Sequence, residues 1–166
     1  MAADRSRFVV SADWVQKQLG APEFRIVDTS WYLPAHGRTG AVEYASGHIP
    51  GAVFFDQDAL ADQTTGLPHS LLSPARFAEE MGQLGISVTD TIVVYDGPGF
   101  FSAPRAWWML RVMGARNVYV LDGGIDAWKA EGRPLETDLP EPAPVTFVFD
   151  FDRKRVTSFA EMREIA

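Results

Sequence analysis

The chain has 166 residues, no cysteine and a formal net charge of −7 at pH 7. Its length predicts one domain with a full core, and 46% hydrophobic and 22% charged residues are typical of a soluble globular protein. The lack of cysteine excludes disulfides and thiol catalysis within this chain, and the acidic balance disfavours nucleic acid as a partner, since Arg153–Arg155 is a short basic run. No apolar run approaches the roughly 18 residues of a membrane span, and no signal-peptide core follows Met1, so we expect no membrane partner and a cytoplasmic location.

The first predicted elements are a helix and a buried strand. Ser11 is a typical N-cap, Trp14 and its apolar neighbours share one helical face, and Gly20 ends the helix. The compact apolar run Phe24–Asp28 then predicts a buried strand that ends in an acid. A long polar loop is expected from there to His48.

The second half of the chain alternates strands with helices. Residues 49–56 predict a turn and a brief strand, and Ser73-Pro74 predicts the start of a helix that ends at Gly85. The remaining expected elements are a strand, a helix, a strand and a helix over Thr91–Tyr95, Ser102–Met113, Asn117–Leu121 and Ile125–Ala130. This alternation predicts an α/β fold with a mostly parallel sheet and helices on both faces.

The chain changes character after Pro134. The run Pro140–Pro144 favours extended backbone, and Val145–Phe151 alternates in the manner of an edge strand or of a segment that docks on the domain. Residues 134–155 are therefore interpreted as a linker that follows a domain spanning 8–133. Val156-Thr157 repeats the valine and hydroxyl cap of Val10-Ser11 at an offset of 146 residues, which indicates a truncated first helix of a second domain over 156–166.

The most informative motif is the loop from Asp96 to Ser102. It follows a predicted strand, contains Gly97 and Gly99, and enters a helix, so several amide N–H groups can converge on one point. Such a nest suits a thiolate, an oxyanion or a phosphate. Here the Asp96 carboxylate is expected to fill the nest itself and to repel an external anion; the alternative is that Asp96 only ends a strand and caps a turn.

Three other functions for this loop fit the sequence poorly. Gly97-x-Gly99-x-x-Ser102 imitates a dinucleotide fingerprint, but its third glycine is serine and Pro98 separates the first two. A Cys-x5-Arg phosphatase loop would need cysteine and arginine where the chain has Asp96 and Ser102. No Gly-x-Ser-x-Gly elbow is present.

Several polar residues are candidates for structural roles. His36, His48 and His69 lack ligand spacing, so no metal site is expected, and His48 is expected to order its turn through ring hydrogen bonds. Asp28, Asp56 and Asp122 all end predicted strands, with Arg38 and Arg105 as expected ion-pair partners. Trp31 follows a strand end and is expected to lie near the Asp96 loop.

Tyr44-Ala-Ser-Gly-His48-Ile-Pro-Gly-Ala52 resembles the pattern of aromatic, any three, His, aliphatic, Pro-Gly-Ala that marks rhodanese domains. Three further stretches resemble the N-terminal domain of two-domain 3-mercaptopyruvate and thiosulfate sulfurtransferases: Val27–Pro34, Phe101–Trp108 and Val120–Trp128. The Phe-Ser-Ala-Pro-Arg run is more similar to the mercaptopyruvate branch. The likeness runs from about Val10 to the end of the chain.

The resemblance implies a tandem architecture of two α/β domains, each with a mostly parallel sheet of about five strands. In that family the second domain carries the cysteine that becomes a persulfide, whereas the first bears an acid at the position of Asp96. It implies that this chain is catalytically silent by itself, needs no cofactor, and contributes Trp31 and Phe101 to an interdomain cleft for a small sulfur donor. The partner it implies is a missing C-terminal domain, without which this part could dimerise. The alternative is a stand-alone, non-catalytic binding or regulatory module.

Overall fold

The computed structural model describes residues 6–165, and its centre is a five-stranded sheet in the order β1-β5-β4-β2-β3. All four strand pairs are parallel. The strands are β1 (Val9–Val10), β2 (Phe24–Asp28), β3 (Val53–Phe54), β4 (Thr91–Tyr95) and β5 (Val118–Leu121). The α/β architecture is confirmed. β1 was not predicted, because two residues are too few to show a period; it forms where Val9 pairs with Val120.

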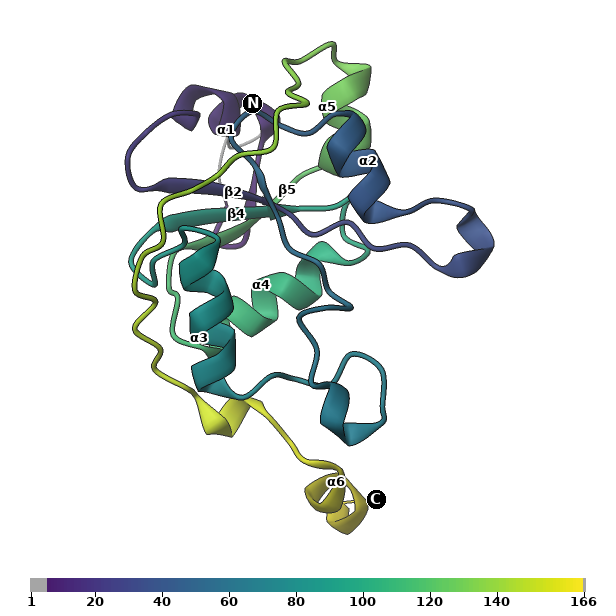
Figure 1. The fold of residues 1–166 in the computed structure, drawn as a ribbon, viewed down its shortest axis with the longest axis vertical. Coiled ribbons are helices and arrows are strands. Elements are labelled where there is room, and N and C mark those ends of the chain that lie inside the picture. The colour runs from purple at the N-terminus through teal and green to yellow at the C-terminus, as the bar shows by residue number, and fades with distance from the viewer. Residues whose placement is uncertain (1–5, 166) are drawn as a thin grey trace.

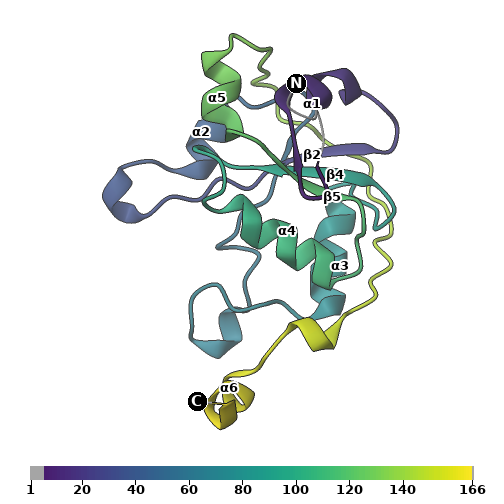
Figure 2. The ribbon, with the colours of Figure 1, turned by 180° about the vertical axis from the view of Figure 1, so that it is seen from behind.

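Helices cover both faces of the sheet, as the alternation predicts. The helices are α1 (Ala12–Gln18), α2 (Gly40–Ser46), α3 (Pro74–Gln83), α4 (Ala103–Val112), α5 (Gly124–Ala130) and α6 (Phe159–Ile165). α1, α2 and α5 lie on one face, and α3 and α4 lie on the other (Figures 1 and 2). This arrangement brings the Asp96 loop, between β4 and α4, to the carboxyl edge of the sheet.

The segment before His48 differs from the loop that the sequence predicts. It contains a 3₁₀ turn, Pro34–His36, and the whole of α2. α2 begins at a glycine because a Cβ at Gly40 would approach the Ser30 carbonyl oxygen to 2.0 Å. A short helix that starts at glycine and buries little besides Tyr44 carries no strong apolar period, so packing rather than propensity explains it.

The side chains of successive residues in β4, the central strand, point into two separate hydrophobic cores. Val93 and Tyr95 belong to the core with α1, α2 and α5, whereas Ile92 and Val94 belong to the core with α3 and α4. Trp128 of α5 is fully buried in the first core. The central strand is therefore buried on both faces, as expected for a parallel sheet.

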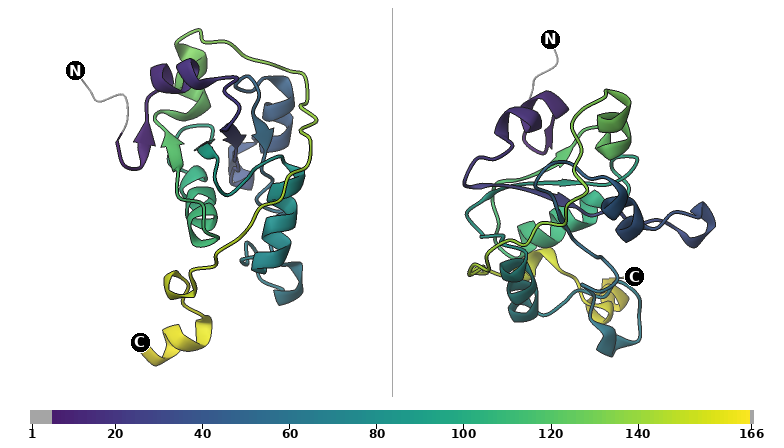
Figure 3. Two further views of the ribbon diagram at one scale, coloured as in Figure 1. Left: turned by 90° about the vertical axis from the view of Figure 1, so that its left-hand side faces the viewer. Right: turned by 45° about the horizontal axis from the view of Figure 1, so that its top comes forward.

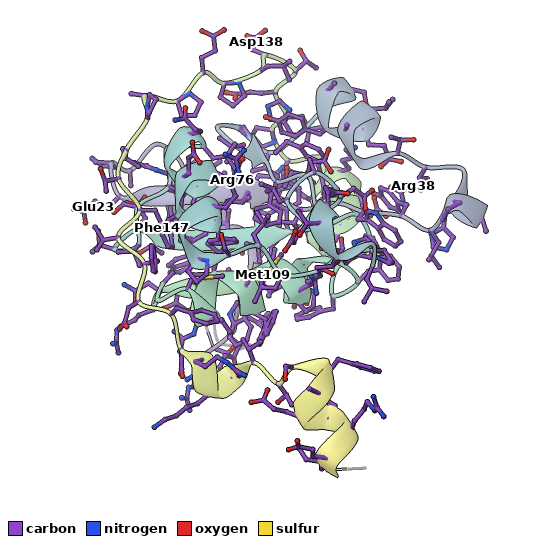
Figure 4. The ribbon with its side chains drawn as sticks, turned by 60° about the horizontal axis from the view of Figure 1, so that its bottom comes forward. Glu23, Arg38, Arg76, Met109, Asp138 and Phe147 are labelled. Atoms are coloured by element: carbon purple, nitrogen blue, oxygen red, sulfur yellow. The ribbon has the colours of Figure 1, made fainter. Side chains whose placement is uncertain are left out.

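The C-terminal segment packs on the domain without joining the sheet. The Val145 amide donates to the Gly82 carbonyl at 3.0 Å, and the Asp150 amide donates to the Met113 carbonyl at 2.9 Å. Phe147, labelled in Figure 4, is only 4% exposed. Its ring packs edge-on against Phe77 at 6.0 Å between ring centroids. The edge-strand alternative is wrong, and Val145–Phe151 is a docking segment.

α6 lies apart from the sheet and its covering helices (Figure 3). Its N-cap is Ser158 and not Thr157: the Glu161 amide donates to Ser158 Oγ at 3.2 Å, and the Ser158 amide donates to Glu161 Oε2 at 2.6 Å. This reciprocal capping box fixes the helix start locally. Its apolar side chains, including Phe159 and Ile165, are exposed. Within residues 6–165 no helix combines the length and apolarity needed to cross a membrane.

Candidate functional site

The Asp96 carboxylate is the centre of the loop at the carboxyl edge. It is 1% exposed and accepts four backbone N–H groups. Oδ1 accepts from Gly99 at 2.5 Å, and Oδ2 accepts from Phe101, Ser102 and Ala103 at 2.7, 2.7 and 2.8 Å. The last two amides belong to the start of α4, whose dipole also favours a negative charge. The predicted amide contacts are present, and the nest is filled from within.

Close packing leaves no room in this nest for a second anion. A Cβ at Gly97 would meet the Tyr32 hydroxyl at 2.1 Å, and one at Gly124 would meet the Asp96 carbonyl oxygen at 2.4 Å. Phe100 adopts a left-handed backbone with φ of 59°, which is rare for an aromatic residue. The surrounding contacts therefore hold the loop in a strained conformation around its own carboxylate.

An aromatic surface lies over the nest, made of Trp31, His36, His69 and Phe101. The rings of Trp31 and Phe101 stack at 6.4 Å with 19° between their planes, and His69 meets Trp31 edge-on at 5.1 Å. Phe101 is 45% exposed, and Trp31 Nε1 donates to Asp58 Oδ2 at 2.9 Å. The surface combines an apolar platform with the polar atoms of His69 and Asp58, which lie 3.6 Å apart.

Ser102 ties this surface to the nest. Its amide donates to Asp96, while its Oγ donates to the Thr29 carbonyl at 2.9 Å and accepts from the Trp31 amide at 3.1 Å. Gln57 completes the junction, because its Nε2 donates to the carbonyls of Thr29 and Ser102 at 2.8 and 3.0 Å. Three loops of the carboxyl edge are thereby fixed relative to one another.

The prediction that Arg38 and Arg105 pair with the strand-ending aspartates is wrong. Arg38, labelled in Figure 4, lies close to α2 and α5. Its Nε donates to Glu43 of α2 at 2.6 Å, and its Nη2 lies 3.2 Å from Asp126 of α5. Arg105 donates to the His69 carbonyl through Nη2, its Nε has no partner among the described residues, and burial lowers its pKa. Arg38 joins two helices, and Arg105 supports the segment that carries His69; neither contacts a strand-ending aspartate.

The aspartates that end strands have local structural roles. Asp28 Oδ1 accepts from the Ser30 amide at 2.8 Å, and burial raises the pKa of this carboxyl. Asp56 Oδ1 caps the following turn through the amides of Asp58 and Ala59. Asp122 is exposed after β5. These three carboxylates do not converge on one point.

His48 orders the turn after α2, in agreement with the prediction. Its Nδ1 lies 2.8 Å from the Tyr44 carbonyl, and its ring stacks on Tyr44 at 4.1 Å. Among the described residues, no group of three or more histidine, aspartate or glutamate side chains is placed to hold a metal ion.

The sequence did not indicate His69, Asp58 or Gln57 as members of this site. All three come from the irregular segment between β3 and α3, which carries no period or motif that would point to the carboxyl edge. The one available signal was the position of Asp56, Gln57 and Asp58 directly after a strand, where loops of parallel sheets gather their polar groups.

The sequence profile of the rhodanese-like domain matches residues 11–131. The chain therefore belongs to the rhodanese-like domain family. Its curated relatives are named as sulfurtransferases. Thiosulfate/3-mercaptopyruvate sulfurtransferase 1 of Arabidopsis thaliana is 48% identical over 129 residues, which cover 78% of this chain and 34% of the relative. The human 3-mercaptopyruvate sulfurtransferase is 39% identical over 164 residues, which cover 95% of this chain and 55% of the relative.

A solved structure is similar over nearly the whole chain. SseA from Escherichia coli, described with the rhodanese fold and catalytic mechanism of 3-mercaptopyruvate sulfotransferases, superposes with a TM-score of 0.89 at 39% identity. The match covers 96% of this chain and 61% of SseA. The chain thus spans between 34% and 61% of these three relatives.

Proposed function

We propose that this chain is the non-catalytic N-terminal half of a two-domain sulfurtransferase that takes sulfur from 3-mercaptopyruvate or thiosulfate. The observation that carries the proposal is the Asp96 nest. Four amides and a helix N-terminus, which would suit a thiolate, are occupied by a buried carboxylate in a chain without cysteine. The nucleophile must therefore belong to another domain, and the names of the relatives support the same reaction class.

In the proposed reaction a cysteine thiolate of the C-terminal domain attacks the sulfur of the donor and retains it as a persulfide. The bond between that sulfur and the rest of the donor breaks at the same time, so that pyruvate leaves from 3-mercaptopyruvate, as an enolate that takes up a proton, or sulfite leaves from thiosulfate. Cyanide or an acceptor thiol then takes the outer sulfur and releases the thiolate. No residue of this chain exchanges a bond or a proton in these steps. Its contribution is to close the cleft and exclude water, with Trp31 and Phe101 facing the donor.

The aromatic surface suits this role because it is rigid. Hydrogen bonds to Asp58 and Ser102 hold Trp31, and the Phe101 amide donates to the Asp96 carboxylate. A preorganised wall loses little conformational entropy when a second domain or a donor binds against it. Phe101 has no hydroxyl, so its part is apolar contact only.

The first experiment is an assay of the 166-residue chain for cyanide-dependent thiocyanate release from either donor. We expect no release above a heat-killed control, because the chain lacks a thiol. Clear release would contradict the proposal. The gene sequence beyond codon 166 is the second test: a further rhodanese-like domain with a cysteine between a strand and a helix is expected there.

In that longer protein, Phe101→Ala should reduce kcat/KM by roughly tenfold, the effect of about 1.4 kcal/mol of lost contact. Phe149→Ala is the matched control, since Phe149 is also well exposed, at 42%, but directly precedes Asp150, whose amide bonds Met113 at the end of α4 that is far from the Asp96 loop. Equal effects of the two substitutions would contradict a role of Phe101 in the cleft.

The alternative function is a stand-alone, non-catalytic rhodanese-like module that binds or regulates a partner. It would be favoured if the gene encoded no second domain. The proposed compartment is the cytoplasm, although the Arabidopsis relative is named as mitochondrial. The proposed partners are the C-terminal domain and the sulfur donor, and the isolated chain is expected to dimerise through α6 and the aromatic surface.

A further inference from the structure

Four arginines gather at the amino edge of the sheet, opposite the Asp96 loop. Arg7 and Arg116 each stand two residues before adjacent parallel strands, β1 and β5. Arg111 comes from the last turn of α4, and Arg155 from the 3₁₀ turn Arg153–Arg155. We call these four residues the arginine cluster. They come from four separate parts of a chain whose net charge is −7.

Aromatic rings and a carbonyl hold two of these side chains, those of Arg7 and Arg111, in place of carboxylates. The Arg7 guanidinium lies 5.2 Å from the Phe8 ring centre, and that of Arg111 lies 5.8 Å from the Trp107 ring centre. Arg111 Nη1 also donates to the Arg116 carbonyl, while its buried Nε has no partner among residues 6–165. Within the same residues, Arg7, Arg111 and Arg116 form no ion pair with a carboxylate.

Two neighbouring cavities share Arg111 and Arg116. The first has a volume of about 270 Å³ and is also lined by Arg155, Asp150 and Asp152. The second, of about 240 Å³, is also lined by Arg7 and by the aromatic wall of Phe8, Trp107 and Tyr119. Both are large enough for a small polyatomic anion.

The charges of the cluster are unbalanced. Asp152 pairs with Arg155 at 2.9 Å, and Asp150 is the one further carboxylate that lines the first cavity, so the cations outnumber the acids. Burial, and then the charges of the other three arginines, lower the pKa of the Arg111 guanidinium, and no acid offsets them. A bound dianion would relieve this repulsion, and the guanidinium fork matches its oxygen atoms.

We propose that the arginine cluster is a binding site for a phosphate-class dianion. Arg111 and Arg116, which both cavities share, hold the anion, and Arg7 and Arg155 flank it. The source is either free phosphate or the phosphoryl group of an ester, whose organic part would contact Phe8 and Trp107. The site is independent of the proposed sulfur chemistry, because it lies at the other edge of the sheet and requires no second domain.

Two-dimensional amide NMR of the chain tests this proposal. The chain is titrated with sodium phosphate, pyrophosphate and a nucleoside monophosphate, each against sodium chloride at equal ionic strength. Saturable shifts are expected at amides of residues 114–118 and 150–152, with pyrophosphate tighter than phosphate. Tighter binding of the nucleoside monophosphate than of phosphate would assign an ester as the source; equal binding would assign the free anion.

Arg116→Gln should weaken phosphate binding about tenfold, because one charge-assisted contact is lost. Arg76→Gln is the matched control: it removes the same charge from an exposed position on α3, where Arg76 pairs with Glu79 and Glu80 (Figure 4). Arg7→Gln provides a second exposed variant of the cluster. Equal losses in the Arg116 and Arg76 variants, shifts no larger than those with chloride, or shifts centred on the Asp96 loop would overturn the proposal.

Discussion

The two edges of the sheet treat negative charge in opposite ways. At the carboxyl edge, four amides converge on the Asp96 carboxylate, so the donors are satisfied within the fold. At the amino edge, the arginine cluster has more cations than acids, and two aromatic rings and one carbonyl hold the side chains of Arg7 and Arg111. Buried backbone N–H groups need a hydrogen-bond partner within the fold. Guanidinium groups at the surface can instead be hydrated by water until an anion binds. The Asp96 nest at the first edge therefore stabilises the fold and is closed to an external anion, whereas the arginine cluster at the second edge can bind one.

The largest effect is expected at Phe147, which anchors the segment that carries Asp150 and Asp152 to the arginine cavity. Phe147→Ala should lower the free energy of unfolding by about 3–5 kcal/mol, because it leaves a cavity beside Phe77. Urea denaturation measures the change, with Phe149→Ala, at a 42% exposed position, as the control. Equal losses of stability in the Phe147 and Phe149 variants would mean that Phe147 does not anchor this segment to the core.

The next largest effect tests the nest. Asp96→Asn keeps the shape but removes the charge and one acceptor oxygen, so it should cost about 2–3 kcal/mol of stability at pH 7. Asp122→Asn is the control, since Asp122 also follows a parallel strand but is exposed. If both variants unfolded at the wild-type denaturant concentration, the amide contacts of Asp96 would contribute nothing.

A pH-dependent effect is expected at Glu43, which joins the carboxyl edge to α2. The hydrogen bond from Arg38 is the main cause that lowers the pKa of Glu43. Its stabilisation should therefore be complete above the unfolded pKa of about 4.3 and be lost as the pH falls through the folded value. Glu43→Gln should cost about 1 kcal/mol or less at pH 7.

Chemical denaturation at several pH values measures the difference between wild type and the Glu43 variant. This difference should shrink as the pH falls below the unfolded pKa of about 4.3. Glu79→Gln, which removes a carboxylate from an exposed pair on α3, controls for the change in net charge. A difference that stays constant or grows toward acid would contradict the assigned role of Arg38.

The smallest effect is expected at Arg116, in the arginine cluster at the amino edge of the sheet. Arg116→Gln should change stability by no more than about 0.5 kcal/mol, because Arg116 is exposed and has no carboxylate partner among the described residues. Thermal unfolding without phosphate measures this change. Phosphate should then raise the melting temperature of wild type more than that of the variant. A large loss of stability without phosphate would make Arg116 a structural residue.

Local chemistry explains which elements were predictable. Phe24–Asp28 and Thr91–Tyr95 are continuous apolar runs, and both strands have the predicted bounds. α2 and β1 were missed because each is short and depends on a neighbour: α2 on the close approach of Gly40 to Ser30, and β1 on the open edge of β5. Propensity is a weak prior where tertiary packing decides.

Three features could be predicted from the sequence alone: the α/β fold, the rhodanese-type motif around His48, and a loop whose backbone amides meet the Asp96 carboxylate. These features depend on residues that are close together in the chain, so their spacing predicts the local geometry. The partners of Arg38 and Arg105, the arginine cluster, and the positions of His36 and His69 in the aromatic surface could not be predicted without the tertiary structure. Each of these joins residues from distant segments, and their distances exist only after the parallel sheet brings the ends of its strands to common edges.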